Sequence, residues 1–336
     1  MPIVAIDARD AFAGQLRGWG RYTRELLGGL PERPGLTYRV LRRGGPGPEL
    51  AFEQLGLPVR LARLRADLVH APSCFLPLAR PCPGVVTIHD LAFEEFPRDF
   101  SARTGWKYRT FTPRAARSAQ RVICVSGYTA ADVVRRYGVD EARVRVIPNA
   151  PSLPIGDEPV PDGGPYLLAV GDLRPKKNLL RLVEAFRMLR GGGLEHRLVL
   201  AGADGGESAR LRAAAAGEPV ALTGYLGDAR LDVLMRGADA LVHPSLYEGF
   251  GLVLVEAMAR GVPVVAARAT ALPETGGDAA EYFDPLDVGD MAAAISRVVG
   301  DRERHAELAR LGRDRARRLS WATSAALTVA VYEEML

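Results

Sequence analysis

Short apolar runs alternate with helical patterns along almost the whole chain, and this alternation constrains the fold more strongly than any other feature. Parallel strands cannot be joined by tight turns, so each needs a crossover segment, which is usually a helix. The alternation therefore predicts an α/β protein whose mostly parallel sheets carry helices on both faces. The expected strands are residues 3–7, 37–42, 67–70, 83–89, 122–126, 144–147, 166–170, 197–201, 220–223, 240–243 and 264–266. The expected helices are residues 21–30, 129–137, 179–189, 230–236, 252–260, 290–299, 301–318 and 320–334.

The alternation is interrupted once, between residues 151 and 165, where five prolines and the adjacent Gly163 and Gly164 occur. Proline removes a backbone donor and glycine is costly to order, so no regular element is expected there. We predict two domains, residues 1–152 and 166–319, joined by a linker at residues 153–165. Two α/β domains joined in this way favour a ligand cleft between them, at the carboxyl ends of the strands.

The composition is that of a globular protein in water, with 48% hydrophobic and 25% charged residues. No apolar run approaches the roughly 18 residues that a membrane span requires. The first seven residues lack the basic start and long apolar core of a signal peptide, so a cytoplasmic protein is expected. Cys74, Cys82 and Cys124 have no metal-ligand spacing and are expected to be free, buried thiols.

Charge is distributed unevenly along the chain. Residues 1–150 hold 23 Lys and Arg against 14 Asp and Glu, a net charge of +9, and the remainder has a net charge of −5. The basic half suggests an anionic partner: an acidic or lipid-phosphate acceptor, or peripheral contact with the inner face of an anionic membrane. Scattered, solvated arginines explain the same charge equally well. No nucleic-acid partner is expected, because no basic and aromatic reading surface occurs.

The stretch from Ser245 to Glu256 combines a strand end, a glycine-containing turn and a helix start. Free backbone N–H groups and the positive end of a helix dipole meet at such a point, which suits a phosphate. Glu248 lies in the turn, where its carboxylate can accept hydrogen bonds from sugar hydroxyls. Glu256 lies about one helical turn into the helix, where it can bind both hydroxyls of a ribose. The alternative is an ordinary loop-to-helix junction with two solvated glutamates.

A second strand end, at residues 170–178, carries three cations: Arg174, Lys176 and Lys177. The chain has 44 lysines and arginines but only three lysines, so the adjacent pair indicates that a compact ammonium charge is required here. Such cations can stabilise the charge on a departing diphosphate without a metal ion. No Asp-x-Asp pair or His/Cys/Glu cluster with ligand spacing occurs, so no metal is expected. A solvated loop before a helix is the alternative.

Histidines and aromatic residues in loops complete the candidates. His89 emerges from the carboxyl end of a strand, where it can bind the transferred sugar or the acceptor, move a proton, or be satisfied by the backbone. His243 lies within an apolar strand and is expected to be a core residue. Acceptor choice is expected in loops such as residues 92–108, whose aromatic side chains suit either a lipid or a packed core: Phe93, Phe96, Phe100 and Trp106.

Several common nucleotide and hydrolase motifs do not occur. The glycines of residues 202–206 follow a Gly-x-x-Gly-Gly spacing, which differs from the Gly-x-Gly-x-x-Gly of dinucleotide-binding loops. Neither Gly-x-x-x-x-Gly-Lys-Ser/Thr nor Gly-x-Ser-x-Gly occurs in the chain. Their absence argues against P-loop NTPases and α/β-hydrolases.

Together these residues resemble the retaining glycosyltransferases of family 4, which have the GT-B fold. The central resemblance is the E-x7-E spacing of Glu248 and Glu256, and the similarity covers almost the whole chain. These motifs are jointly specific for the family, though not for a substrate. The other segments that resemble the family are residues 6–9, residues 18–22 at the end of the glycine-rich segment 11–20, the His-Asp turn 87–91, residues 125–126, 147–149, the basic loop 171–178 and residues 272–274.

The resemblance implies two Rossmann-like domains: an N-terminal acceptor-binding domain and a C-terminal domain that binds a nucleotide-sugar. The last helix, residues 320–336, would cross back to the first domain. The implied catalytic residues are Lys177, Glu248, His89 and Arg174. The implied donor-binding residues are Gly18, Gly20, Lys176, Asn178, Tyr225, Phe250, Gly251, Leu252, Val253 and Glu256.

One position departs from the family pattern. Many members carry Arg directly after the glycine of the basic loop, whereas this chain has Asp172. A subset that resembles bacterial polysaccharide mannosyltransferases and rhamnosyltransferases also lacks that Arg, and this chain is similar to that subset. Arg174 or Lys176 is then the candidate for the second phosphate contact.

The expected function is that of a retaining glycosyltransferase that is independent of metals and cofactors and acts in polysaccharide biosynthesis. It would move a hexose from a nucleotide-diphosphate sugar, with GDP-mannose favoured, to a glycan, lipid-linked or small-molecule acceptor. One alternative is an inactive partner subunit that only binds the nucleotide-sugar. The feature that supports this alternative is Asp172. Another is an epimerase or a phosphorylase on the same scaffold, although no phosphate or cofactor site of a phosphorylase is evident.

Overall fold

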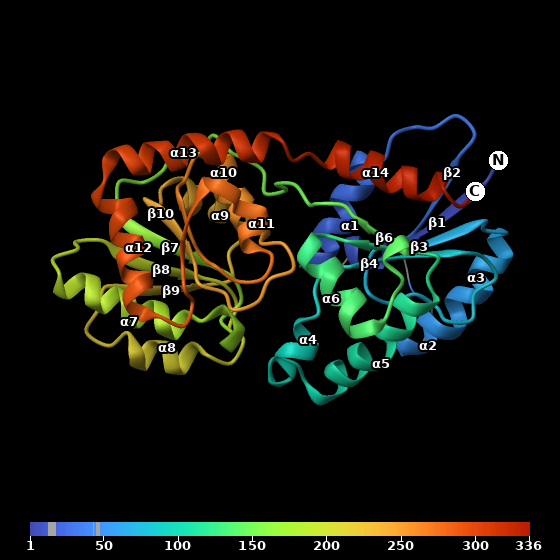
Figure 1. Cartoon of the computed structure of the whole chain (residues 1–336), viewed down its shortest axis with the longest axis horizontal. Coiled ribbons are helices and arrows are strands. Elements are labelled where there is room, and N and C mark those ends of the chain that lie inside the picture. Colours follow the sequence, from blue (N-terminus) through green and yellow to red (C-terminus); the bar gives the residue numbers. More distant parts are fainter. Residues whose placement is uncertain (13–17, 43, 45–47) are drawn as a thin grey trace. The chain divides into compact units, whose positions relative to one another are not determined.

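The computed structural model describes residues 1–12, 18–42, 44 and 48–336 of the chain (Figure 1). The middle of the glycine-rich segment noted at residues 11–20 lies outside the described residues. The chain forms two compact units. The first consists of Met1–Ala150 together with Leu319–Leu336, and the second of Pro151–Arg318.

The first unit is built on a six-stranded sheet in the order β2-β1-β3-β4-β5-β6, with every pair of neighbours parallel. Most of its central strand residues are buried on both faces, as expected when helices cover a parallel sheet. The strands are β1 (Ile3–Asp7), β2 (Thr37–Leu41), β3 (Leu68–Ala71), β4 (Gly84–Ile88), β5 (Arg121–Cys124) and β6 (Val144–Val146).

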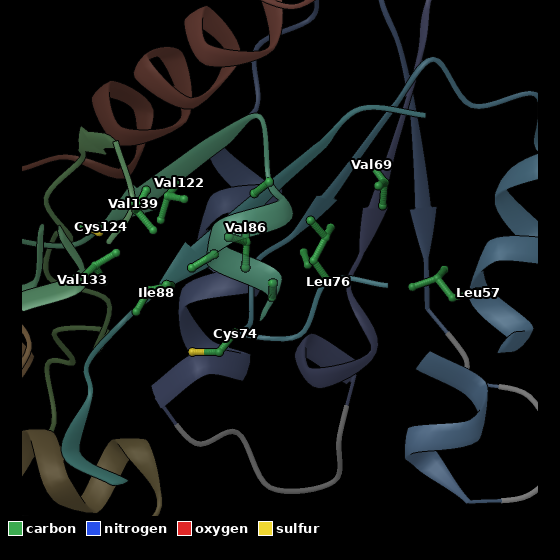
Figure 2. Packing of buried hydrophobic residues seen from close by; sticks show 14 of the residues in the cluster. Leu57, Val69, Cys74, Leu76, Val86, Ile88, Val122, Cys124, Val133 and Val139 are labelled. Atoms are coloured by element: carbon green, nitrogen blue, oxygen red, sulfur yellow. The ribbon is translucent and has the colours of Figure 1, made fainter. Parts of the chain in front are cut away.

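Helices and strands of this unit share a large apolar core (Figure 2). Leu57 begins α3, Val86 belongs to β4 and Cys124 ends β5, and all three are fully buried. Burying a side chain of this kind contributes roughly 1.5–3 kcal/mol. Cys74, Cys82 and Cys124 are free and buried, as predicted. The helices are α1 (Gly18–Gly29), α2 (Glu49–Ala51), α3 (Leu57–Leu64), α4 (Ala92–Glu95), α5 (Ala102–Ser118), α6 (Gly127–Tyr137) and α14 (Trp321–Glu333).

The prediction of a loop at residues 92–108 is wrong. The segment contains α4, a 3-10 turn at Pro97–Asp99 and the start of α5. Ser101 caps α5, because its Oγ accepts a hydrogen bond from the Thr104 N–H at 3.2 Å. Phe93 is buried and Phe100 packs against the core, so for these residues the packed-core alternative holds. Trp106 is 54% exposed.

The last helix, α14, packs on the sheet of the first unit. Ser320 is its N-cap, and its Oγ accepts from the Thr323 N–H at 3.1 Å. Tyr332 Oη lies 2.6 Å from His70 Nδ1, and His70 Nε2 lies 2.8 Å from Thr87 Oγ1 on β4. Burial lowers the pKa of His70 to about 3, so the ring is neutral near pH 7. A buried polar chain thus joins α14 to β3 and β4.

The second unit contains another six-stranded parallel sheet, in the order β12-β11-β10-β7-β8-β9. Its strands are β7 (Tyr166–Val170), β8 (Arg197–Ala201), β9 (Val220–Gly224), β10 (Ala240–His243), β11 (Val264–Ala267) and β12 (Ala280–Phe283). Its helices are α7 (Leu179–Gly191), α8 (Ser208–Ala214), α9 (Asp228–Arg236), α10 (Leu252–Ala259), α11 (Leu272–Gly276), α12 (Val288–Gly300) and α13 (Arg302–Arg317). The sequence patterns missed β12, which is short and follows two glycines.

We expect Tyr332→Phe to lower the free energy of unfolding by about 1–3 kcal/mol, because it leaves the buried His70 Nδ1 without its partner. Urea denaturation of wild type and variant measures the change. Tyr38→Phe is the matched control, since Tyr38 Oη is buried and has no hydrogen-bond partner in the described part of the chain. Removing the Tyr38 hydroxyl should leave the free energy of unfolding unchanged or raise it. Equal effects of the two substitutions would contradict the proposed importance of the Tyr332–His70 contact.

Candidate functional site

The two loops singled out from the sequence follow neighbouring strands of the second sheet. β7 pairs with β8 on one side and with β10 on the other, so the strand order reverses between β7 and β10. Loops at such a switch point diverge and leave a crevice at the carboxyl ends of the strands, where ligands bind in open α/β sheets. The loops after β7 and β10 are also joined directly, because Leu246 N–H donates to Lys176 O at 2.8 Å.

The N-terminus of α10 depends on Gly251. This residue has φ 92° and ψ 51°, a left-handed conformation that side chains disfavour. A Cβ at this position would also lie 2.7 Å from Leu272 Cδ2. As the N-cap, Gly251 supplies no side-chain hydrogen bond, so the first N–H groups and the dipole of the helix suit an anion. Phe250 is 7% exposed, so any ligand contact there would use its backbone.

Lys177 and Glu248 form an ion pair across the two loops. Lys177 Nζ lies 2.5 Å from Glu248 Oε1, and the two side chains are 15% and 13% exposed. The lysine stem crosses Gly171, where a Cβ would lie 3.0 Å from Lys177 Cε. Thr270 holds the backbone of Glu248: its Oγ1 accepts from Glu248 N–H at 2.9 Å and donates to Glu248 O at 3.0 Å. Nothing in the sequence pattern indicated Thr270.

His243 also contacts the carboxylate of Glu248. It is 2% exposed, so the predicted core position is right, but its Nε2 lies 3.1 Å from Glu248 Oε1. His243 stands at the carboxyl end of β10. A place at a strand end is the criterion that selected His89, and it could have marked His243 as well. Burial by itself would raise the pKa of Glu248, but Lys177, Lys176 and His243 together hold that pKa well below its usual value. Glu248 is therefore a carboxylate near neutral pH.

The other cations of the basic loop have different surroundings. Arg174 Nε lies 3.7 Å from Asp172 Oδ2, and both side chains are partly exposed, so this pair contributes little to stability. Asp172, which stands where many family members have Arg, thus lies close to Arg174, the candidate to take over the role of that Arg. The charge of the Lys176 ammonium also lowers the pKa of Glu248.

Asn178 and Tyr225 lie at opposite extremes of exposure. Asn178 precedes α7 as its N-cap, in a left-handed conformation, and its side chain donates to Pro285 O at 2.7 Å and accepts from Arg181 Nη1 at 2.9 Å. These contacts commit its amide to holding the loop. Tyr225 is 57% exposed and follows Gly224 at the end of β9. The donor-binding roles of both residues stay predictions, as do those of Leu252 and Val253 in the first turn of α10.

Glu256 lies in α10 and holds the segment that precedes the second sheet. Its Oε1 accepts from Ser152 N–H at 2.7 Å, Leu153 N–H at 2.9 Å and Ser152 Oγ at 3.1 Å. Its Oε2 lies 3.4 Å from Arg260 Nη1. In this structure the carboxylate is therefore occupied by the chain itself, and its predicted contact with a ribose stays a prediction.

The segment at residues 152–158 is hydrogen-bonded to side chains of the second unit at several positions. The side chain of Arg260 is fully buried and donates from Nη2 to Leu153 O and Pro154 O, both at 2.9 Å. Asp232 accepts from Gly156 N–H at 3.1 Å. The predicted linker lacks regular structure, but its first half is an ordered strap rather than a free tether. Arg260 stands four residues after Glu256, a spacing that could have indicated the pair.

In the first unit, His89 stacks on Trp19 with 5.9 Å between ring centroids and meets Tyr22 edge-on at 4.6 Å. Its Nε2 lies 2.7 Å from Pro72 O. A carbonyl can only accept, so Nε2 carries the proton and Nδ1 is the acceptor of the ring. Burial lowers the pKa of His89 to about 4, which makes it a weak base at neutral pH. The backbone therefore satisfies Nε2 of His89, and the low pKa of the ring disfavours a role in moving a proton.

Gly18 and Gly20 both lie in the first turn of α1. Among the residues that the structure describes, none would lie within 4 Å of a Cβ on Gly18. Gly20 is buried within the helix. Their contact with a donor stays a prediction. In the part of the chain that the structure describes, no group of three or more His, Cys, Asp or Glu residues could hold a metal ion. No described helix is long and apolar enough to cross a membrane.

We expect Glu256→Ala to speed amide exchange at Ser152 and Leu153 by about 10- to 100-fold. Hydrogen bonds to a charged group contribute about 1.5–3 kcal/mol, and each tenfold change in exchange corresponds to about 1.4 kcal/mol. Hydrogen–deuterium exchange of residues 151–154 gives the measurement. Glu184→Ala removes an exposed carboxylate from α7 and should leave this exchange unchanged. Equal protection in Glu256→Ala and wild type would refute the anchoring role.

Two family models match the chain. One, described as glycosyl transferases group 1, matches residues 155–315, and the other, described as glycosyltransferase family 4, matches residues 22–151. The O-antigen chain mannosyltransferase B of Escherichia coli is 29% identical over 287 residues, which cover 79% of this chain and 74% of that protein. The MMP alpha-(1->4)-mannosyltransferase of Mycolicibacterium hassiacum is 31% identical over 296 residues, which cover 80% and 71%.

Solved structures share the architecture. The Anabaena protein HepE, crystallised in complex with UDP-glucose, superposes with a TM-score of 0.76 over 99% of this chain and 100% of that chain. The two sequences are 20% identical, so this likeness concerns the fold alone.

Proposed function

This chain belongs to the family-4 glycosyltransferases and has their GT-B fold, and on that premise we propose a retaining, metal-independent mannosyltransferase. In this proposal it transfers a hexose, mannose, from GDP-mannose to a glycan, lipid-linked or small-molecule acceptor. The two mannosyltransferase relatives support the choice of sugar. The guanine base rests on the resemblance to polysaccharide mannosyltransferases.

The observation that carries the proposal is the Lys177–Glu248 pair beside the uncapped N-terminus of α10. The helix N–H groups at Gly251 and Leu252 bind the diphosphate, and Lys177 turns toward it as negative charge builds during departure. Both contacts on the Glu248 carboxylate, within the described residues, go to Oε1. Its Oε2 accordingly accepts a hydroxyl of the sugar.

Retention is proposed to follow from attack on the same face of the sugar. The acceptor oxygen forms a bond to the anomeric carbon as the bond from that carbon to the diphosphate oxygen breaks, and the acceptor's proton passes to the departing phosphate. Glu248 is a poor nucleophile for a double-displacement route, because cations and a histidine already hold its Oε1. In the first unit, the neutral His89 accepts a substrate hydroxyl at Nδ1 and does not act as the base.

Family membership favours a transferase over an epimerase or a phosphorylase. The inactive-subunit alternative rested on Asp172, and the neighbouring Arg174 offers a replacement cation for the second phosphate. Turnover with GDP-mannose distinguishes an active transferase from an inactive subunit. Peripheral membrane contact stays a prediction from the net charge of +9 on residues 1–150.

We expect Lys177→Ala to lower kcat by roughly one to three orders of magnitude, because it removes a cation that stabilises the leaving group. Release of GDP from GDP-mannose, with acceptor present, reports the rate. Arg187→Ala is the control, since it removes a cation of the same unit that is 44% exposed and pairs weakly with Glu218. Turnover that is unchanged in Lys177→Ala would exclude this lysine from the mechanism.

The low pKa of Glu248 has a consequence for the pH profile of kcat/KM for the donor. Since the nearby lysines hold this pKa well below its usual value, protonation of Glu248 should not reduce the rate between pH 7 and about pH 5. In Lys177→Ala the carboxylate loses its main stabilising charge while staying buried, so its pKa rises and the acid limb moves to higher pH. An acid limb at the same pH in both proteins would contradict this assignment.

A further inference from the structure

His243 ends β10 with its ring buried and its Nε2 toward Glu248. The rest of the strand is Ala240, Leu241 and Val242, all fully buried, so an aliphatic residue would fit the pattern better than an imidazole. Burying a polar ring costs free energy unless it makes a hydrogen bond. The contact with Glu248 supplies that bond, because an ionised carboxylate oxygen accepts from Nε2–H at 3.1 Å.

The backbone also fixes the direction of this ring. Pro244 follows directly, and a residue before proline is restricted to extended conformations. Parallel pairing of His243 with Ala266 on β11 adds a second restraint. The imidazole therefore has little freedom, whereas Lys177 has a flexible stem with four rotatable bonds.

Lys177 holds the same oxygen of Glu248, at 2.5 Å, and the proposed function asks this lysine to serve the departing diphosphate as well. When its ammonium turns toward phosphate, Glu248 loses its closest partner. A partly buried carboxylate with no fixed donor would rotate toward solvent or toward the cations. Some other group must then keep Oε2 directed at the sugar.

We propose that His243 is a positioning residue for the donor sugar, holding Oε1 of Glu248 so that Oε2 stays in place while Lys177 binds the diphosphate. The proposal rests on the proposed function, and it deepens it by separating two tasks. His243 and Glu248 serve the hexose, and Lys177 with the N-terminus of α10 serves the diphosphate. Losing His243 should weaken sugar recognition and transfer but leave binding of the nucleoside diphosphate intact.

The test compares His243→Gln with His243→Leu. The glutamine amide can still donate to Glu248, whereas leucine fills the space without a donor. Calorimetry with GDP and with GDP-mannose gives the affinity that the sugar adds, and initial rates give kcat/KM for GDP-mannose. In the leucine variant we expect an unchanged Kd for GDP, loss of most of the sugar's added affinity, and kcat/KM lower by about 10- to 100-fold. The glutamine variant should recover to within about threefold of wild type.

Three results would overturn the proposal: a leucine variant equal to wild type, a glutamine variant as impaired as leucine, or weaker GDP binding in parallel with the loss of transfer. The last would mean that His243 only supports the local fold. Failure of the proposed function is separate, because wild type that binds GDP-mannose more tightly than GDP but transfers nothing would contradict transfer alone. The sugar's added affinity would still test His243 in that case. Wild type that binds neither compound would contradict both.

Discussion

The ion pair of Lys177 and Glu248 is the interaction on which the account of the second unit depends. It spans 2.5 Å between loops that follow β7 and β10, and those loops meet only because the two strands are neighbours at the point where the strand order reverses. Gly171 gives the lysine stem its path, and Thr270 fixes the backbone of the glutamate. Lys177 and His243 both contact Oε1 of Glu248, which offsets part of the cost of burying the two charges.

Helix α10 connects this site to the strap that begins the second unit. Its first turn directly follows the loop that carries Glu248, while Glu256 and Arg260, farther along the chain, bind the backbone of residues 152–154. One short helix thus carries both the proposed anion-binding position and the side chains that anchor residues 152–154. A ribose at Glu256 would compete with Ser152 for the same oxygen, so ligand binding and strap anchoring draw on one carboxylate.

The fold class was predictable because buried parallel strands are short, continuous apolar runs, and β7, β8 and β10 occur at the expected residues. The helix at Ala102–Ser118 was missed, because arginines and a proline obscure its apolar stripe. Within the site, glycine spacing and a rare lysine pair marked the two loops, so Lys177 and Glu248 were found. His243 was assigned to the core although it ends β10, where a strand-end signal was present. Thr270 was missed because its contact with Glu248 depends on loop geometry, which no local pattern encodes.

The most direct test of the account is a thermal-shift comparison of wild type and Lys177→Ala with UDP, GDP, dTDP, ADP and CDP. A ligand at about 100 times its Kd adds roughly 2.7 kcal/mol to the stability of the folded state, which is a measurable rise in Tm. We expect GDP to raise the Tm of wild type more than the other nucleotides do, and the rise to be smaller in the variant. No shift with any nucleotide, or equal shifts in both proteins, would contradict a diphosphate site at Lys177.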